Sequence, residues 1–343
     1  MKKYAASCSE KNKNGRLTVL YTVGLSFLLL SAILGAVLGS TVISLTELWR
    51  ALCERDLTSS AVRILLFVRL PRTIASILCG AALSCAGAVI QGVLANRLAS
   101  PSIIGVNSGA GLAVTCAAAF GIYSGFRLSL LSFLGAFLTV LFVSTVAGRY
   151  GTRSGTLILI GVAVNAMLGA VSDGIVAFDP DIATMTFDFR VGDFSSVTYQ
   201  KIVSIAPFVI GALIVLILLS KELDVLSLGE DSARGLGMNT TLVRITFLIL
   251  SALLSGCAVS CAGMLSFVGL MVPHTIRRIS RTGHFHLISL CAIYGGGFVS
   301  LSDTLARTIF SPYELPVGII MAFLGAPFFV FILLRGKGVG RDA

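Results

Sequence analysis

The sequence predicts an all-α membrane protein that crosses the bilayer many times. Hydrophobic residues make up 56% of its 343 residues, and charged residues make up only 12%. A soluble domain carries about 25% charged residues, so this chain has too few charges to cover a water-soluble fold of its size. Apolar runs long enough to cross a bilayer recur along the whole chain. These observations exclude a cytosolic enzyme, a disordered chain and a secreted disulfide-rich scaffold.

Ten apolar segments are each expected to form a helix. A polar, basic tail over residues 1–16 precedes the first, which is too long for the core of a signal peptide. The eighth is short and contains Pro273, which is typical of a half-helix buried in protein. A second polar tail covers residues 335–343, so the membrane domain spans residues 17–334. The expected helices are 17–39, 73–94, 103–120, 128–147, 156–172, 202–219, 241–263, 265–276, 287–302 and 315–334.

The positive charges predict which loops face the cytoplasm, where short loops carry an excess of Lys and Arg. If the N-terminus is cytoplasmic, ten spans return the C-terminus to the cytoplasm, and 17 of the 26 Lys and Arg residues fall inside. The net charge of +10 is therefore assigned to membrane topology and not to nucleic-acid binding. Arg69, Arg72 and Arg307 break the rule, because they lie at the outer ends of the second and ninth spans.

A repeated octet links the two halves of the chain. The sequence GAALSCAG at 80–87 matches GCAVSCAG at 256–263 at six of eight positions. The copies lie in the second and seventh spans, so they cross the membrane in opposite directions, as in transporters with inverted repeats. Chance matching between helices rich in small residues is the alternative. In either case the small residues let the helices approach closely.

The chain carries no recognisable energy source of its own. It has no GxxxxGK[ST] phosphate-binding loop and no HExxH or GxSxG motif. The spans hold almost no ionisable residues, which argues against coupling to protons or sodium. A transporter of this kind takes its energy from a partner. An ion-coupled secondary transporter remains the alternative, and a structural or sensory membrane subunit is a third class.

Cysteine and histidine do not indicate a metal site. Six of the eight cysteines lie within apolar runs and are interpreted as small buried hydrophobic residues, and no CxxC occurs. His274 belongs to a VPH motif, and His284 and His286 lie in a cytoplasmic loop. We therefore expect no bound metal or other cofactor on this chain.

Short motifs follow one another in a fixed order along both halves of the chain. The first half contains RLPR at 69–72, GAAL at 80–83, GAVIQG at 87–92, NRLASP at 96–101 and GVNSG at 105–109. The second half contains LGEDSARGLG at 228–237, FVGLMVPH at 267–274, DTLAR at 303–307, ELPVG at 314–318 and GAPF at 325–328. In this order they resemble the FecCD-type permeases, the membrane subunits of ABC importers for iron-siderophores, haem and vitamin B12.

The resemblance implies an inverted-repeat, type II ABC importer permease fold in the bacterial plasma (inner) membrane, with both termini cytoplasmic. It implies a homodimer or a pair with a close homologue, two ATPase subunits on the cytoplasmic side and one periplasmic or lipoprotein substrate-binding protein outside. The chain itself would be no enzyme, since ATP and Mg would bind to the ATPase subunits. The implied cargo is an iron chelate, then haem, then a corrinoid.

The resemblance also assigns a coupling role to residues 223–237, between the sixth and seventh spans on the cytoplasmic side. In the family this element docks on the ATPase and transmits its closure. Glycines predict short, broken helices here, and an ordinary amphipathic connecting loop is the alternative. The residues in the matched motif are Leu228, Gly229, Glu230, Ser232, Ala233, Arg234, Leu236 and Gly237.

The three outer arginines match positions that, in the vitamin B12 relatives, receive acidic residues of the binding protein. Arginine suits this role because its planar fork pairs with a carboxylate through two hydrogen bonds and keeps its charge. Arg69, Arg72 and Arg307 are therefore expected to dock the binding protein. Anchoring of helix ends at the lipid headgroups is the alternative, and Asp303 could pair with Arg307 from four residues earlier.

Two further regions complete the expectation. The gates of the family match Asn96 and Leu98 after the second span, and Ser154 and Gly155 before the fifth, where plain loop is the alternative. Residues 173–199 depart from the family pattern and are expected at the outer mouth, touching either the ligand or the binding protein. This departure leaves the identity of the ligand open.

Overall fold

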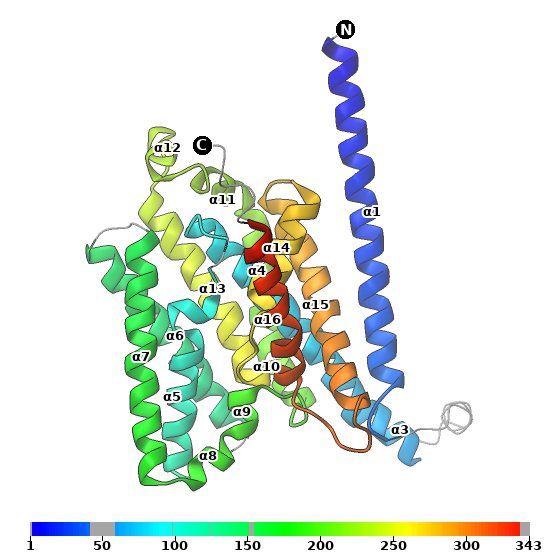
Figure 1. Cartoon of the computed structure of the whole chain (residues 1–343), viewed down its shortest axis with the longest axis vertical. Helices are drawn as coiled ribbons and strands as arrows, with labels where there is room; N and C mark the ends of the chain where they lie inside the picture. The colour runs from blue at the N-terminus through cyan, green and yellow to red at the C-terminus, as the bar shows by residue number, and fades with distance from the viewer. Residues whose placement is uncertain (1, 42–58, 98, 124, 151–153, 337–343) are drawn as a thin grey trace.

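The computed structural model describes residues 2–41, 59–97, 99–123, 125–150 and 154–336. This part of the chain is a bundle of helices without a β-strand (Figure 1). Every expected span coincides with one helix. These are α1 (Lys2–Val37), α4 (Leu70–Val93), α5 (Val106–Ala119), α6 (Gly125–Tyr150), α7 (Ser154–Phe178), α10 (Tyr199–Leu218), α13 (Thr240–Ala262), α14 (Val268–Ser280), α15 (His284–Thr308) and α16 (Val317–Gly336).

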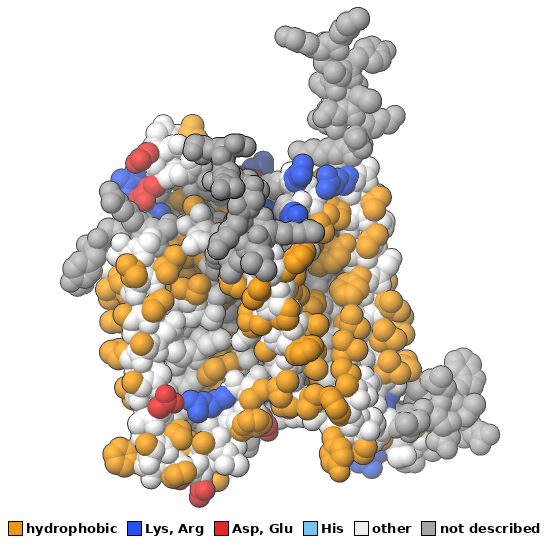
Figure 2. Space-filling view, viewed as in Figure 1, with side chains coloured by type: hydrophobic (Ala, Val, Ile, Leu, Met, Phe, Trp, Pro, Cys, Tyr) orange, Lys and Arg blue, Asp and Glu red, His pale blue; other side chains and the backbone are white. Residues whose placement is uncertain are grey.

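The helices make this chain a multi-pass membrane protein. Seven of those described are long and apolar enough to cross a membrane, and α5 and the apolar part of α16 are shorter. Figure 2 shows hydrophobic side chains over the middle of the visible face and charged side chains near its two ends. The short α14, with Pro273 inside it, packs against α4 and α15, which agrees with a half-helix held within the protein.

Two helices begin well before the expected residue. α1 already starts at Lys2, because the polar tail contains good helix formers and no proline to interrupt the helix. The helix through α4 starts at Ser60, as α3 (Ser60–Ile64) and η1 (Leu65–Arg69) lead directly into it. η1 is a π-helical turn, and this wider turn lies just before Pro71, whose ring would clash with a regular preceding turn.

Short helices mark the two ends of the bundle. α11 (Ser220–Leu226) and α12 (Glu230–Gly235) lie at the end where α1 begins and α16 finishes, which we call the α12 end (Figure 1). α3, α8 (Asp181–Met185) and α9 (Phe187–Val191) lie at the opposite end, which we call the α9 end. A further short helix, η2 (Pro101–Ile104), precedes α5.

Helix α4 is the centre of the packing. Of the residues in its apolar stretch, 83% are buried, and it contacts α13, α14 and α15. A Cβ atom added to Gly80 would lie 2.2 Å from the carbonyl oxygen of Gly295 in α15. A Cβ atom added to Gly87 would lie 1.7 Å from the carbonyl oxygen of Gly269 in α14. The backbones therefore meet directly, as small residues allow in membrane helices.

The two copies of the repeated octet lie in α4 and α13, two helices that pack against each other. α4 runs from the α9 end toward the α12 end, and α13 runs in the opposite direction (Figure 1). The thiol of Cys79, directly before the first copy, lies 3.8 Å from the carbonyl oxygen of Ala258 in the second. This arrangement is the one that an inverted repeat predicts. Five of the six cysteines within the apolar runs are buried, and Cys116 is partly exposed.

Gly87→Ala tests whether the close approach of α4 to α14 is required. The added methyl group would overlap a backbone carbonyl, so we expect thermal unfolding of the detergent-purified protein to show a loss of about 3 kcal/mol. Gly169→Ala in α7 is the matched control, because a Cβ atom there meets nothing within 4 Å. Equal stability of the two variants would contradict the direct contact.

Candidate functional site

Arg72 of α4 holds three carboxylates at the α9 end. Its Nε lies 2.9 Å from Oδ1 of Asp303 in α15, and its Nη1 lies 2.6 Å from Oε2 of Glu314 in the α15–α16 loop. Its Nη2 is 3.6 Å from Oδ1 of Asp193, which follows α9. One side chain thus connects α4 to the segment after α9 and to the end of α15 with its following loop, three regions that lie far apart in the sequence. We call this group, together with Arg69 and Arg307, the outer ionic cluster.

The other two arginines tie α1 to the same cluster. The Arg307 Nε lies 3.1 Å from Oδ2 of Asp303, and its Nη2 donates a hydrogen bond of 3.1 Å to the carbonyl oxygen of Gly35. Arg69 donates to the carbonyl oxygens of Val37 and Thr41. Asp303 is fully buried, so the two guanidinium groups beside it supply the compensation that a buried carboxylate requires.

Burial changes how the three predicted docking arginines can act. Arg69 and Arg72 are each 3% exposed and Arg307 is 2% exposed, whereas the expectation assumed guanidinium groups open to an acidic partner. The expected pairing of Arg307 with Asp303 is present. In this conformation an incoming carboxylate reaches the arginines only by replacing a group they already bind. Carboxylates and carbonyl oxygens of the same chain compensate the positive charges of these arginines, which explains why they can break the charge rule. Their docking role stays a prediction.

Glu314 is the most accessible carboxylate that Arg72 holds, with a side chain that is 33% exposed. Burial alone would raise its pKa. The hydrogen bond of 2.6 Å from the Ser40 hydroxyl and the charge of Arg72 outweigh that effect and hold the pKa of Glu314 below its usual value. Glu314 therefore stays charged at neutral pH, and its attraction to Arg72 is lost only when acid protonates it.

The divergent segment 173–199 forms α8 and α9 and joins the two halves of the chain. Arg190 pairs with Asp173 at the end of α7, with Nη2 and Oδ1 3.1 Å apart. The backbone N–H of Met264 donates to the Phe189 carbonyl at 2.8 Å, and that of Gly318 donates to the Gly192 carbonyl at 3.1 Å. The segment is thus held against the end of α13 and the start of α16.

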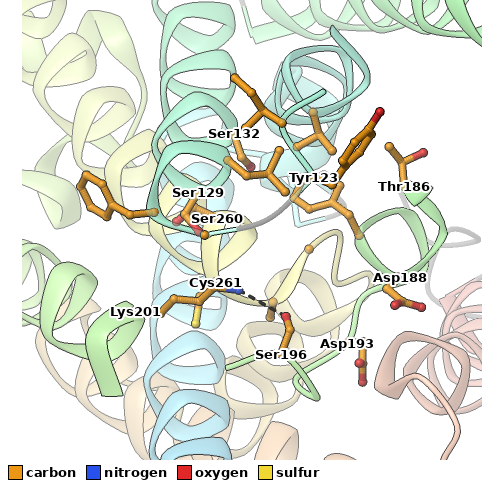
Figure 3. Close-up of a pocket in the computed structure, with 18 of the residues that line it drawn as sticks. Tyr123, Ser129, Ser132, Thr186, Asp188, Asp193, Ser196, Lys201, Ser260 and Cys261 are labelled. Carbon is orange, nitrogen blue, oxygen red and sulfur yellow. Dashed lines mark hydrogen bonds between the residues drawn. The ribbon is translucent and has the colours of Figure 1, made fainter. Parts of the chain in front are cut away.

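A cavity of about 380 Å³ lies beside this segment at the α9 end, between α5, α6, α10 and α13. Figure 3 shows Ser129, Ser132 and Ser260 on one side of it. Lys201, which also lines the cavity, donates a hydrogen bond of 3.3 Å to the hydroxyl of Ser196. The divergent segment supplies one wall, so it lies beside a hollow at the face where the outer mouth was expected.

The coupling motif forms a compact element at the α12 end. As its glycines predict, the loop consists of the short helices α11 and α12. Gly229 and Gly237, on either side of α12, have φ values of +106° and +83°, which favour glycine. Glu230 binds Arg234 at 2.6 Å and Arg244 of α13 at 3.2 Å, so α12 is fastened to the next helix.

The outer surface of this element is partly apolar. Leu228 and Leu236 are 66% and 70% exposed, while Ala233 is fully buried and packs the helix down. Ser232 lies within α12 between them. A short ion-paired helix with an exposed leucine on either side, at the end of a membrane bundle, has the mixed polar and apolar face that docking on another protein requires.

The predicted gate residues are placed only in part. Asn96 lies in the turn after α4, and Leu98 is outside the described residues. Ser154 is the first residue of α7, and its side chain is also outside the description. Gly155 follows it in α7, and a Cβ atom there would meet nothing within 4 Å. The gate role of these four residues stays a prediction.

The sequence expectation missed Glu314 and Asp193 as members of the outer ionic cluster. Glu314 stands in the ELPVG motif and Asp193 stands in the divergent segment, and neither was considered as a partner for an arginine. The available signal was the charge balance. Only Asp303 was considered as a partner for the three arginines at the outer ends of apolar helices. Three positive charges in such a place require further carboxylates nearby.

Asp303→Asn tests the outer ionic cluster. The amide leaves two buried guanidinium groups short of a negative charge, so we expect a loss of about 3–5 kcal/mol in thermal unfolding. Asp173→Asn removes a carboxylate that is also paired with an arginine but is 71% exposed. It is expected to change stability by less than about 1 kcal/mol. Equal effects of the two changes would contradict the cluster's structural role.

Comparison with known proteins agrees with this architecture. Residues 27–335 match the FecCD transport family. The Fe(3+)-citrate import system permease protein YfmD of Bacillus subtilis is 31% identical over 331 residues, covering 96% of this chain and 99% of that protein. The vitamin B12 import system permease protein BtuC of Yersinia pseudotuberculosis is 34% identical over 326 residues, covering 93% of this chain and 94% of that protein.

A solved structure has the same fold. The inward-facing conformation of a metal-chelate type ABC transporter superposes with a TM-score of 0.82 and 27% sequence identity, covering 93% of this chain and 99% of that one. Helix order, the inverted pair α4 and α13, and the family motifs therefore lead to one conclusion. This chain belongs to the FecCD transport family, the membrane-spanning permease subunits of ABC importers.

Proposed function

We propose that this chain forms the membrane pathway of an importer that takes up an iron chelate and is powered by separate ATPase subunits. The proposal of a separate ATPase is supported mainly by the short helix α12. Leu228 before this helix and Leu236 directly after it are exposed to solvent at one end of the bundle, on a chain whose sequence has no nucleotide-binding loop. An ATPase docked there supplies the energy that the chain cannot obtain itself.

The assembly follows from the family. Two ATPase subunits contact the α12 elements of two permease copies, and one substrate-binding protein contacts the α9 end. The second copy is identical or closely homologous, and the pathway runs between the two. The α12 end, with both termini, then faces the cytoplasm, and the α9 end faces outward from the bacterial plasma membrane. ATP and Mg belong to the ATPase subunits, and we propose no enzymatic activity, cofactor or metal ligand on this chain.

The proposed cargo is an iron chelate, with haem and a corrinoid as the next candidates. Similarity to the Fe(3+)-citrate permease and to the metal-chelate transporter structure supports an iron chelate. Similarity to the vitamin B12 permease supports a corrinoid as an alternative cargo. A chelate presents its organic shell to the pathway, so a permease can pass it without ligating the metal. Direct binding of ferric citrate, haemin and cobalamin by the cognate binding protein separates these cargoes.

Leu236→Asp tests the docking of the ATPase on α12. A charge at this exposed apolar position should remove the ATPase that otherwise elutes with the detergent-purified permease, since interface energy concentrates in a few buried side chains. The matched control is Phe285→Asp, which changes another exposed apolar residue near the α12 end, at the start of α15. Repeated purification of the unmodified chain without any P-loop ATPase would overturn the proposed function itself.

For the α9 end we propose docking by exchange of carboxylates. The binding protein's acidic side chain replaces Glu314 on Arg72, because Glu314 is the partly exposed partner and Asp303 is fully buried. This exchange reconciles the predicted docking role of Arg72 with its burial, and the docking roles of Arg69 and Arg307 stay predictions.

Glu314→Gln tests the exchange. Removal of the competing charge should tighten capture of the binding protein by roughly 5-fold or more, within the range of coupling between linked sites. Surface plasmon resonance on the nanodisc-embedded complex measures the change. Asp188→Asn, an exposed acid at the same end, controls for general electrostatics. Unchanged or weaker capture by the Glu314 variant would reject the exchange.

A further inference from the structure

The side chain of Asp224 in α11 caps the distant helix α15. Its Oδ1 accepts a hydrogen bond of 2.9 Å from the backbone N–H of His284, the first residue of α15. The same oxygen lies 2.6 Å from Nδ1 of His284. The first N–H groups of a helix have no partner within the helix, and a carboxylate there also interacts favourably with the helix dipole. α11 and α15 are therefore tied by a bond between backbone and side chain as well as by packing.

The surroundings leave this tie little room. A Cβ atom on Gly283 would lie 2.9 Å from Oδ2 of Asp224, so glycine provides the space that the carboxylate occupies. His284 is only 4% exposed. A Cβ atom on Gly92 of α4 would lie 3.1 Å from Nε2 of His284 and 3.0 Å from Cδ1 of Leu223. The α11–α15 tie is thus packed directly on α4, at the point where three helices meet.

The tie lies between the coupling motif and the longest buried elements of the bundle. Hydrogen bonds from the N–H groups of Ser227 and Gly229 to the carbonyls of Leu223 and Leu226 continue α11 up to the start of α12. α15 then runs for 25 residues, or about 37 Å at 1.5 Å per residue. It ends at Asp303 and Arg307 in the outer ionic cluster. One continuous set of contacts therefore joins the surface of α12 to the α9 end.

The corner between α14 and α15 also holds buried polar atoms with unmet hydrogen bonds. Within the described structure these include Nε2 of His284, Nε and Nη2 of Arg277, Oγ of Ser280 and Oγ1 of Thr282. Such groups cost free energy when they are buried without partners. A rearrangement of the corner, a bound water or a docked partner would supply the missing partners, so this corner gains hydrogen bonds if it moves.

We propose that Asp224 and His284 form the joint through which movement of the coupling element 220–237 reaches α15 and α4. This inference rests on the proposed function. It assigns positioning roles to Asp224, which lies in the coupling loop but before the matched motif 228–237, and to His284, which lies outside that loop. A simple cap would contribute only to stability. A joint additionally determines how much cargo moves for each ATP hydrolysed, because α15 follows α12 only while the tie holds.

The test measures cargo imported per ATP hydrolysed in proteoliposomes that contain the complete transporter, with ferric citrate and its binding protein as the probe. Asp224→Ala should lower this ratio by about fivefold or more, the lower end of coupling between distant sites. Asp224→Asn retains an acceptor oxygen for the His284 N–H, so it should recover part of the ratio. His286→Gln is the matched control, because His286 contacts Tyr21 of α1 at 3.1 Å and not α11.

A second variant keeps the joint testable if Asp224→Ala fails to fold. His284→Gln leaves the backbone cap and removes the imidazole, so it too should lower the ratio. An unchanged ratio in a folded Asp224→Ala or His284→Gln transporter overturns the joint. If the Leu236→Asp variant loses the ATPase in the same preparation while the ratio here is unchanged, the proposed function stands and only the joint fails. If the unmodified chain never binds an ATPase, the proposed function fails first.

Discussion

The structure depends on how closely α4 approaches its neighbours. At Gly80 and Gly87 its backbone touches the carbonyl groups of α15 and α14, with no space for a Cβ atom. In a bilayer the hydrophobic effect does not drive helices together, so close packing has to supply much of the association. The position of α4 then determines where α13, α14 and α15 can lie, and through them the two ends of the molecule. A chain with 12% charged residues can fold this way because it relies on shape more than on charge.

The few buried charged side chains connect helices to one another. Asp303 and Arg72 join α15 to α4 at one end of the bundle, and Asp224 joins α15 to α11 at the other. Both ties involve the same long helix. Among the described residues, the buried charges of Arg72, Asp303 and Arg307 are occupied by structural pairing at one end of the bundle. This arrangement fits a transporter that receives its energy from outside the membrane better than one that moves ions through it.

Much of the fold was predictable, because membrane helices follow directly from apolar runs. Each of the ten expected helices exists, and the small residues of the repeated octet lie at close contacts between helices, as their spacing predicts. Helix ends were less predictable. α1 extends through a polar tail, since nothing in the tail stops a helix, and α4 is prolonged by a π-helical turn before Pro71. Such ends depend on local geometry that a hydropathy pattern does not record.

The sequence indicated where the candidate site residues lie along the helices and loops, but not what surrounds them in the fold. The family motifs located the three outer arginines and the glycine-bounded α12. They did not indicate that the arginines are buried, because Glu314 and Asp193 approach Arg72 from segments more than a hundred residues away from it in sequence. The same limit hid the contact of Asp224 with His284. Pairings of this kind follow from the helix packing and become visible only when the chain is folded.

The most direct test of the central claim is the energy source of transport. Right-side-out membrane vesicles carrying the chain, its ATPase and its binding protein would be supplied with radiolabelled ferric citrate. The account predicts uptake that requires ATP inside the vesicles and continues when a protonophore collapses the proton gradient. Uptake that persists without ATP and stops with the protonophore would contradict it.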